Sequence, residues 1–382
     1  MNKNLVDKIT SSFINKYNTQ PKIVFSPGRI NLIGEHTDYN DGFVLPAAID
    51  KGIITAIEKS NSELCTVYAY DKDKTLHFYL NDIQPLQNGS WENYVLGVIA
   101  EIQKKGIELT PFNIVFGGDI PEGAGLSSSA ALENSIVFGL NEIFQLGLTK
   151  EEMIFISQKA EHNFVGVKCG IMDQYASMFG KENHILLLDC RTVKAKSFRI
   201  EFNNYELVLI NTNVKHSLSD SAYNDRRSVC EKISAMLGKK ALRDARKEDL
   251  IKIKDQISEE DYQKALYVIQ ENERTQNAAK AITDNDILKL GELIYRSHDG
   301  LQHQYKVSCE ELDYLVDRAK ENDGVIGARM MGGGFGGCTI NVVAKEATKG
   351  FVNKISKKYK KQFNKACSVY QVKLSNGTHL IK

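Results

Sequence analysis

The sequence has no excess of charge of either sign, since 49 lysines and arginines stand against 48 aspartates and glutamates. A strongly basic surface attracts nucleic acid and acidic membranes, so this balance predicts neither partner. Hydrophobic runs are also short, and none reaches the ~18 apolar residues that indicate a membrane-spanning helix. These absences favour a protein whose partners are small molecules.

Paired cysteines are missing as well. The seven cysteines are odd in number and scattered, with no C-x-x-C spacing, which argues for reduced thiols and against a disulfide framework or a zinc site. The N-terminus lacks the apolar core of a signal peptide, and Leu5, Ile9 and Phe13 instead mark one face of a helix. We therefore expect a cytoplasmic protein.

Four side chains that suit a hydroxyl-rich ligand are concentrated in the segment 26–39, SPGRINLIGEHTDY. Arg29, Glu35, His36 and Asp38 lie within ten residues, shortly after an apolar run. Carboxylates accept hydrogen bonds from sugar hydroxyls, and histidine either donates or accepts. A polar loop with a local salt bridge is the alternative, which this segment alone leaves open.

A second segment, 121–131 (PEGAGLSSSAA), has the composition of a phosphate-binding loop. It follows a strand-like run at 112–116. The residues after it indicate an amphipathic helix through apolar side chains spaced by four, namely Leu132, Ile136, Leu140 and Phe144. Gly123 and Gly125 allow close approach of the backbone to a ligand, and the start of a helix attracts phosphate. A plain serine cap is the alternative, and a Walker A loop is excluded because no Gly-Lys-Ser/Thr follows.

Five glycines occur within the six residues 332–337. They match the dinucleotide pattern G-x-G-x-x-G formally, but the alternating, β-branched segment 338–344 predicts a strand where a helix is required. A dinucleotide site is therefore excluded. Because glycine loses much conformational entropy on folding, we expect this backbone to approach a ligand or another loop closely. A tight hairpin that binds nothing is the alternative.

A third polar segment carries Glu161 and Asp173. A capping-box pattern from Thr149 to Glu152 predicts a helix that ends near Glu161. Asp173 has apolar neighbours in the sequence, and carboxylates are seldom buried without a partner. We expect Asp173 either to pair with a cation, for which Arg29 is the candidate, or to take part in function.

In their order and spacing, the three segments resemble the signatures of the superfamily that comprises galactokinase, homoserine kinase, mevalonate kinase and phosphomevalonate kinase. Residues 28–39 are similar to the sugar-recognition signature of the galactokinase branch, and residues 169–174 (CGIMDQ) to its catalytic segment. The resemblance extends from about Lys22 to Val343. Met331 departs from it, since some relatives carry a small hydroxyl residue beside the glycines.

The resemblance implies transfer of the γ-phosphate of ATP to the anomeric hydroxyl of D-galactose, giving α-D-galactose 1-phosphate. Asp173 would act as the base toward that hydroxyl, and Arg29 would neutralise charge on the phosphoryl group. The sugar hydroxyls would be held by Glu35, His36, Asp38, the backbone of Gly170, and Tyr223. The phosphates of ATP would lie on Gly123, Ala124, Gly125, Leu126, Ser127, Ser128 and Ser129.

Two further roles are implied by the same resemblance. Ser128 and Glu161 would position Mg²⁺, which prefers oxygen ligands. Trp91 and Tyr94 would lie near the adenine of ATP, although this single tryptophan could equally be a core residue.

The implied fold is α+β, with two domains and the active site in the cleft between them. We place the domains at 1–203 and 204–382, and we expect a monomer with no macromolecular partner. A kinase for another sugar, such as N-acetylgalactosamine or arabinose, is one alternative. A non-catalytic sensor of galactose and ATP is another, disfavoured because the serine tract, Arg29 and Asp173 are intact. A mevalonate-type kinase would not explain the sequence EHTD at 35–38.

Overall fold

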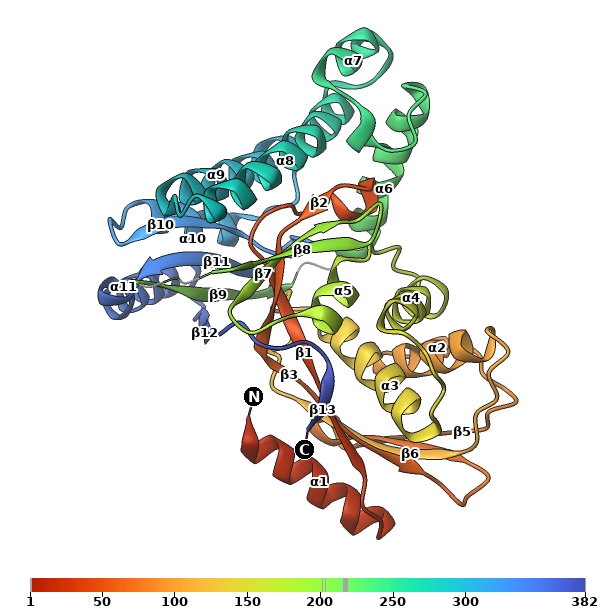
Figure 1. Ribbon diagram of the computed structural model, residues 1–382. Coiled ribbons are helices and arrows are strands. Elements are labelled where there is room, and N and C mark those ends of the chain that lie inside the picture. Colours follow the sequence, from red (N-terminus) through yellow and green to blue (C-terminus); the bar gives the residue numbers. More distant parts are fainter. Residues whose placement is uncertain (1, 201, 203, 216–218, 382) are drawn as a thin grey trace.

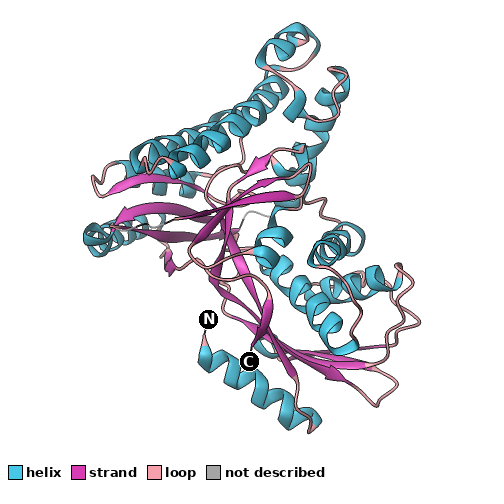
Figure 2. Cartoon of the chain, in the orientation of Figure 1, coloured by secondary structure: helices cyan, strands magenta, loops and turns pink. Residues whose placement is uncertain are grey.

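The computed structural model describes residues 2–200, 202, 204–215 and 219–381, which form three β-sheets flanked by helices (Figures 1 and 2). The α-helices are α1 (Lys3–Tyr17), α2 (Trp91–Gln103), α3 (Ser128–Phe144), α4 (Lys150–Ala160), α5 (Met172–Phe179), α6 (Ser219–Met236), α7 (Lys247–Lys252), α8 (Glu259–Thr283), α9 (Ile287–Asp299), α10 (Glu310–Lys320) and α11 (Lys345–Phe363). The strands are β1 (Lys22–Asn31), β2 (Phe43–Val44), β3 (Pro46–Lys59), β4 (Cys65–Ala69), β5 (Lys74–Phe78), β6 (Phe112–Gly118), β7 (His184–Asp189), β8 (Lys194–Arg199), β9 (Tyr205–Lys215), β10 (Val325–Met330), β11 (Gly336–Ala344), β12 (Ser368–Val372) and β13 (His379–Ile381). The predicted α+β class is confirmed.

The first sheet, in the order β13-β1-β3-β6-β4-β5, has helices on both faces. α1 packs against β3 and β6, whereas α3 and α5 pack against β1 and β3 from the other side, with α2 and α4 beyond α3 (Figure 1). Alternation along β1 explains this arrangement, since successive side chains of a strand point to opposite faces. Phe25 joins Ile9 and Phe13 of α1 in one cluster, whereas Val24 lies against α3. The helix face predicted at the N-terminus is thus confirmed.

The second sheet, in the order β10-β11-β9-β12, is also covered by helices on both faces. Along β9, Leu207 and Leu209 pack with residues of α8 and α9, while Val208 and Ile210 pack with residues of α10 and α11. A strand buried on both faces reads as a continuous apolar run, which is what the sequence shows here.

A small third sheet, in the order β2-β7-β8, lies where the two larger sheets meet. One hydrophobic cluster joins Ile30 and Leu32 near β1 to Leu209 of β9 and Ile340 of β11, so the two halves share a continuous core. The division at 203 and 204 falls between β8 and β9 and stays a prediction. It misses the return of the C-terminal strand β13, which pairs with β1 in the first sheet.

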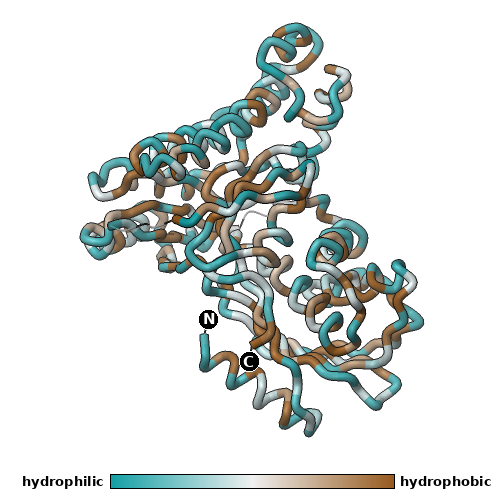
Figure 3. The backbone as a smooth tube through the Cα atoms, in the orientation of Figure 1, coloured by the Kyte–Doolittle hydropathy of each residue, from teal (hydrophilic) through white to brown (hydrophobic). Residues whose placement is uncertain are grey.

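Hydropathy follows this packing. Figure 3 shows hydrophobic segments along the inner strands and alternating hydrophobic and hydrophilic segments along the outer helices α8 and α9, the pattern of helices with one buried face. Among the described residues, no helix has both the length and the apolar character needed to cross a membrane.

Candidate active site

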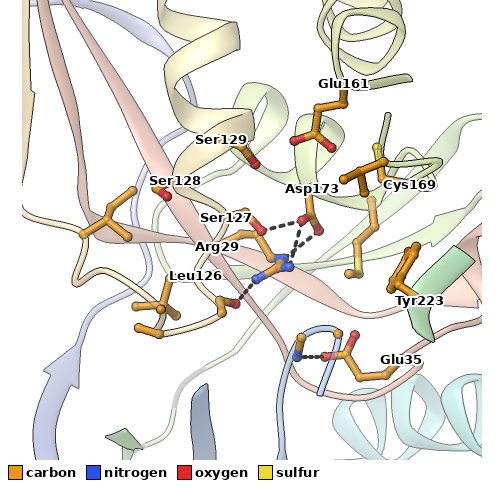
Figure 4. Close-up of a pocket in the computed structure, with 18 of the residues that line it drawn as sticks. Arg29, Glu35, Leu126, Ser127, Ser128, Ser129, Glu161, Cys169, Asp173 and Tyr223 are labelled. Atoms are coloured by element: carbon orange, nitrogen blue, oxygen red, sulfur yellow. Dashed lines mark hydrogen bonds and ion pairs between the residues drawn. The ribbon is translucent and has the colours of Figure 1, made fainter. Parts of the chain in front are cut away.

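The three predicted segments meet in one cavity of about 360 Å³. This volume lies within the range of small-molecule sites. Its walls come from both halves of the chain, since β1, the loop before α3 and the start of α5 are joined by Tyr223 of α6 and by Gly332 and Gly333 of the glycine tract. Figure 4 shows these side chains converging on the space between the loop and α5.

Arg29 and Asp173 form the centre of this cavity. Arg29 is buried on β1, which continues through Pro27 and Gly28 with a shift in its register against β3. Its Nε donates to Oδ1 of Asp173 at 2.8 Å and its Nη2 donates to Oδ2 at 2.9 Å, a bidentate pair (Figure 4). The third nitrogen, Nη1, donates to the carbonyl of Gly125 at 2.5 Å. The predicted partnership is therefore confirmed, and it links the phosphate-loop segment to the start of α5.

Ser127 completes the surroundings of Asp173. Its hydroxyl donates to Oδ2 of Asp173, so this serine orients the carboxylate (Figure 4). The residue adopts a left-handed conformation with φ of 57°, and α3 begins directly after it. The amides of the first helical turn have no acceptor within the helix, which suits an anion, and phosphate binding by this loop stays a prediction.

The glycine tract packs against the phosphate-binding loop. A Cβ placed on Gly125 would lie 3.2 Å from the carbonyl oxygen of Met331, and one on Gly332 would lie 3.3 Å from the carbonyl oxygen of Gly125. Both glycines have positive φ, which side chains other than glycine rarely adopt. Of the roles that the sequence left open, approach to another loop explains these glycines.

Glu35 is held by residues that the sequence analysis did not find. Arg329 of β10 is fully buried and its Nη2 donates to Oε1 of Glu35 at 3.0 Å, while the amide of Gly332 donates to the same oxygen at 2.8 Å. Tyr267 of α8 donates from its hydroxyl to the carbonyl of Glu35 at 3.1 Å. Buried Glu271 accepts from the amide of Gly34 at 3.0 Å. The signature is thus fixed by the second half of the chain.

Asp38 lines the cavity, whereas Gly170 is not among the lining residues and instead packs against the Asp38 side chain. A Cβ on residue 170 would lie 2.1 Å from Oδ2 of Asp38, so only glycine fits there. Burial, and secondly the negative charge of Asp173, raises the pKa of Asp38 to about 7. His36 and Tyr223, whose rings lie 5.4 Å apart, line the same cavity as Asp38.

We predict that Asp38→Asn makes the ligand-free protein more stable at alkaline pH while weakening sugar binding. The folded-state pKa of about 7 lies above the ~4 of an exposed aspartate. The protonated carboxyl therefore contributes stability that is complete below pH ~4 and is lost as the pH rises through its folded-state pKa. Asparagine cannot ionise, so the melting temperature of the variant should exceed that of the parent by an amount that grows from pH 5 to pH 8.

Differential scanning fluorimetry across this pH range measures that difference. A gap between the two proteins that stays constant with pH would contradict the raised pKa. Isothermal titration should show weaker galactose binding in Asp38→Asn, with ATP binding unchanged.

Ser128 and Glu161, which are predicted to position Mg²⁺, both line the cavity, and their role toward the metal stays a prediction. Glu161 is buried at the start of a one-turn π-helix (Glu161–Val165) after α4, and the side chain that reaches it is Ser129. In Figure 4 the hydroxyl of Ser128 points away from Glu161. Each residue of an α-helix turns by roughly 100°, so adjacent serines on the first turn of α3 face different directions.

Burial of the Glu161 carboxyl carries an energetic penalty. Burial raises its pKa, and hydrogen bonds from the Cys169 thiol and the Ser129 hydroxyl counteract this effect. Because burial disfavours the charged form, a nearby cation would relieve the penalty. The carboxylate and the hydroxyl are also the oxygen donors that Mg²⁺ prefers, so Glu161 and Ser129 fit such an ion.

A second cavity of about 460 Å³ adjoins the first and contains Trp91 and Tyr94. It shares Ser128, Ser129 and Tyr94 with the catalytic cavity. Trp91 begins α2 and packs edge-on against Phe116 with ring centroids 5.3 Å apart. The Trp91 side chain is therefore a core residue that also forms part of the cavity wall, and its predicted position near adenine stays a prediction.

Comparisons with known proteins agree with this geometry. The galactokinase galactose-binding signature matches residues 11–59, and the N-terminal and C-terminal domains of GHMP kinases match residues 93–181 and 278–361. The galactokinase of Thermosipho africanus is 43% identical over 360 residues, which cover 94% of this chain and 99% of the relative. The galactokinase of Clostridium beijerinckii is 40% identical over 367 residues, 94% of each protein.

Solved structures give the same result. The Lactococcus lactis galactokinase complexed with galactose has a TM-score of 0.94 and 33% identity, covering 98% of this chain and 100% of the other. The Methanococcus jannaschii mevalonate kinase, at 20% identity over 94% of this chain and 99% of its own, shares the fold with a TM-score of 0.66.

The fold and the serine-containing loop therefore define a GHMP kinase, a class of ATP-dependent kinases for small molecules. Matches over nearly the whole length are more specific than the class. The chain belongs to the galactokinase family.

Proposed function

We propose that the protein transfers the γ-phosphoryl group of ATP to the anomeric hydroxyl of D-galactose and releases ADP and α-D-galactose 1-phosphate. The observation that carries this proposal is the bidentate pair of Arg29 and Asp173. It lies between the phosphate-binding loop, which it contacts at Gly125, and the sugar signature at residues 35–38. A phosphoryl donor and a hydroxylated acceptor would meet there.

Phosphoryl transfer depends on alignment and charge neutralisation more than on covalent chemistry by the protein. Asp173 accepts the proton of the anomeric hydroxyl as the new bond from that oxygen to phosphorus forms. The bond from the γ-phosphorus to its bridging oxygen breaks, and ADP leaves. Arg29 keeps the carboxylate in place and adds positive charge beside the transferring group.

The two sides of the cavity divide the binding work. The amides at the start of α3 and the positive-φ loop before it suit the phosphates of ATP. Trp91 and Tyr94 line the adjoining cavity, which has the apolar character that an adenine ring requires. The acceptors Glu35 and Asp38, together with His36 and Tyr223, line the sugar side, and the backbone at Gly170 approaches Asp38 closely beside them.

Ser129 and Glu161 would hold Mg²⁺ at the phosphates. When bound, the ion neutralises charge on the nucleotide and keeps its phosphates in one arrangement. The buried carboxyl of Glu161 supports this assignment, because no lysine or arginine pairs with it within the described residues.

We predict that Glu161→Gln raises the Mg²⁺ concentration needed for half-maximal turnover by about tenfold, as loss of a liganding carboxylate would. The measurement is a Mg²⁺ titration of ADP release at saturating ATP and galactose. Glu152→Gln, in the exposed capping box of α4, is the matched control. An unchanged titration in Glu161→Gln would assign Glu161 a structural role.

The activity itself is tested by ADP release from purified protein with Mg-ATP and one sugar at a time. We expect turnover with D-galactose and none with arabinose, N-acetylgalactosamine or no sugar. Turnover with a different sugar would show that this other sugar is the substrate and would leave the proposed mechanism unchanged. Binding of galactose and ATP without any turnover would instead favour a sensor.

The seven cysteines, all free thiols, support a cytoplasmic setting for this reaction, where we propose that the protein acts as a monomer.

A further inference from the structure

A line of hydroxyl groups runs from His36 into the protein, away from the cavity. Nδ1 of His36 lies 2.8 Å from the hydroxyl of Tyr39, which lies 2.8 Å from the hydroxyl of Tyr305. The Tyr305 hydroxyl in turn lies 3.4 Å from Sγ of Cys230. These residues come from the segment after β1, from the segment after α9 and from α6, so three distant parts of the chain build one line.

The two tyrosines also pack as aromatic rings. Tyr305 lies 5.0 Å from the ring of His36 and 4.8 Å from that of Tyr267, measured between centroids. Tyr305 is fully buried, and neither Tyr39 nor Tyr305 lines the catalytic cavity. Packing alone would be served as well by phenylalanine. The two hydroxyls therefore need a separate explanation, because a buried hydroxyl must find hydrogen-bond partners.

The chemistry at the Cys230 end of this line indicates which group donates in each hydrogen bond. Sulfur is a weak acceptor, whereas phenolic oxygen and imidazole nitrogen are good ones. The side chain of Asn40 also hydrogen bonds to Cys230. The better arrangement has the thiol donating to Tyr305, Tyr305 donating to Tyr39, and Tyr39 donating to Nδ1 of His36. Nε2 of His36 then carries the proton.

The near end agrees with this direction. His36 is buried, and burial, followed by the positive charge of Arg226, lowers its pKa to about 3, so the ring is neutral and carries one proton. The backbone of Gly333 acts on the pKa in the opposite sense, as an acceptor near the ring does. Nε2 makes no hydrogen bond of good geometry within the described chain. The atom is buried, so a proton on it needs an acceptor, and a ligand in the cavity that His36 lines would supply one.

We propose that Tyr39 and Tyr305 are positioning residues that hold His36 as its Nε2–H tautomer, so that His36 acts as a hydrogen-bond donor to galactose. The inference rests on the proposed function. Its chemical consequence follows from the neighbouring acceptors, Glu35 and Asp38, to which sugar hydroxyls donate. A hydroxyl that donates to a carboxylate still has lone pairs, and the Nε2–H group supplies a donor for them.

The direct test is the tautomer of His36 in the intact, sugar-free protein, read from the ¹⁵N chemical shifts of its two ring nitrogens. One of the eight histidine signals is assigned by its loss in His36→Gln. We expect Nε2 to have the shift of a protonated nitrogen and Nδ1 that of a bare one. Protonation at Nδ1 would overturn the proposal, and this outcome does not depend on whether the protein phosphorylates galactose.

Kinetics give an independent readout. Tyr39→Phe removes the donor to Nδ1, and we expect it to raise KM for galactose by about tenfold while KM for ATP stays within about twofold, as expected for one hydrogen bond. Tyr305→Phe should shift KM in the same direction by less. Tyr314→Phe, which removes a hydroxyl bonded to the carbonyl of Lys358 far from the cavity, is the matched control.

A set of deoxygalactoses identifies the hydroxyl concerned. The parent protein should discriminate against the sugar that lacks the hydroxyl bound by His36, and Tyr39→Phe should lose most of that discrimination while keeping it against the other deoxygalactoses. Equal loss against every deoxygalactose, or unchanged discrimination against all of them, would contradict the assignment.

Discussion

Asp173→Asn is expected to lower kcat by a factor on the order of 10² or more, as loss of a positioned base usually does. Asparagine keeps the size of the side chain but cannot take the proton of the anomeric hydroxyl. It also presents an amide nitrogen where Arg29 now donates to two carboxylate oxygens at 2.8 and 2.9 Å. The guanidinium would lose part of its bidentate partner, so alignment and proton transfer should fail together. KM for ATP should change little, because the phosphate-binding loop keeps its backbone.

Single-turnover measurement by rapid quench separates this chemical step from product release. The matched control is Ser127→Ala, which removes a donor to the same carboxylate but leaves its acceptor function. We expect that control to slow the step by less than about tenfold, the scale of one hydrogen bond. A single-turnover rate in Asp173→Asn close to that of the parent would remove Asp173 from the catalytic step.

Arg329→Met is expected to destabilise the protein by about 3–5 kcal/mol, the usual result of removing one partner of a buried ion pair. Arg329 is fully buried, and besides Glu35 it binds the carbonyls of Asn31, Leu32 and Met330. Its loss would leave the carboxylate of Glu35 buried with the amide of Gly332 as its remaining donor at that oxygen. Thermal unfolding followed by circular dichroism should show a lower melting temperature.

The double variant Arg329→Met with Glu35→Gln distinguishes charge from packing. If the uncompensated charge causes the loss, neutralising Glu35 should recover part of the melting temperature. Lys289→Met, which breaks the exposed pair with Glu292, is the control and should melt as the parent does. An Arg329→Met variant as stable as the parent would show that Glu35 does not depend on this arginine.

Local features of the fold were predictable because they depend on local sequence. The capping box from Thr149 to Glu152 and the apolar face of α1 both appear in the structure as expected. The full extent of β1 was harder to predict, because a proline and a glycine such as Pro27 and Gly28 usually end a strand. The strand continues because Gly28 lets it pass within reach of the loop before α3, where a Cβ would lie 2.6 Å from the carbonyl oxygen of Leu126.

The motifs of the candidate site could be predicted from the sequence, but the residues that hold those motifs in place could not. Arg29 stood out because it lies in an unusual polar segment, and Asp173 because its neighbours in the sequence are apolar. Glu271 and Arg329 did not, although both hold the signature in place. Glu271 forms an i,i+3 pair with Arg274, which in a sequence looks like an ordinary surface pair. The contacts of Glu271 with Gly34 and of Arg329 with Glu35 span 237 and 294 positions, and no local pattern encodes such contacts. Which serine of the first turn of α3 contacts Glu161 also depends on how the helix packs, which the local sequence does not specify.

The pairing of β13 with β1 also bears on the order in which the molecule is made. Ile23 lies beside Ile381, which is 358 positions later in the chain. During synthesis from the N-terminus, the edge of β1 beside Phe25 therefore stays open while nearly everything else is translated, and an open strand edge is a place where chains associate wrongly. The strand that carries Arg29 therefore gains its last paired neighbour, along residues 23–25, only after both halves of the chain exist.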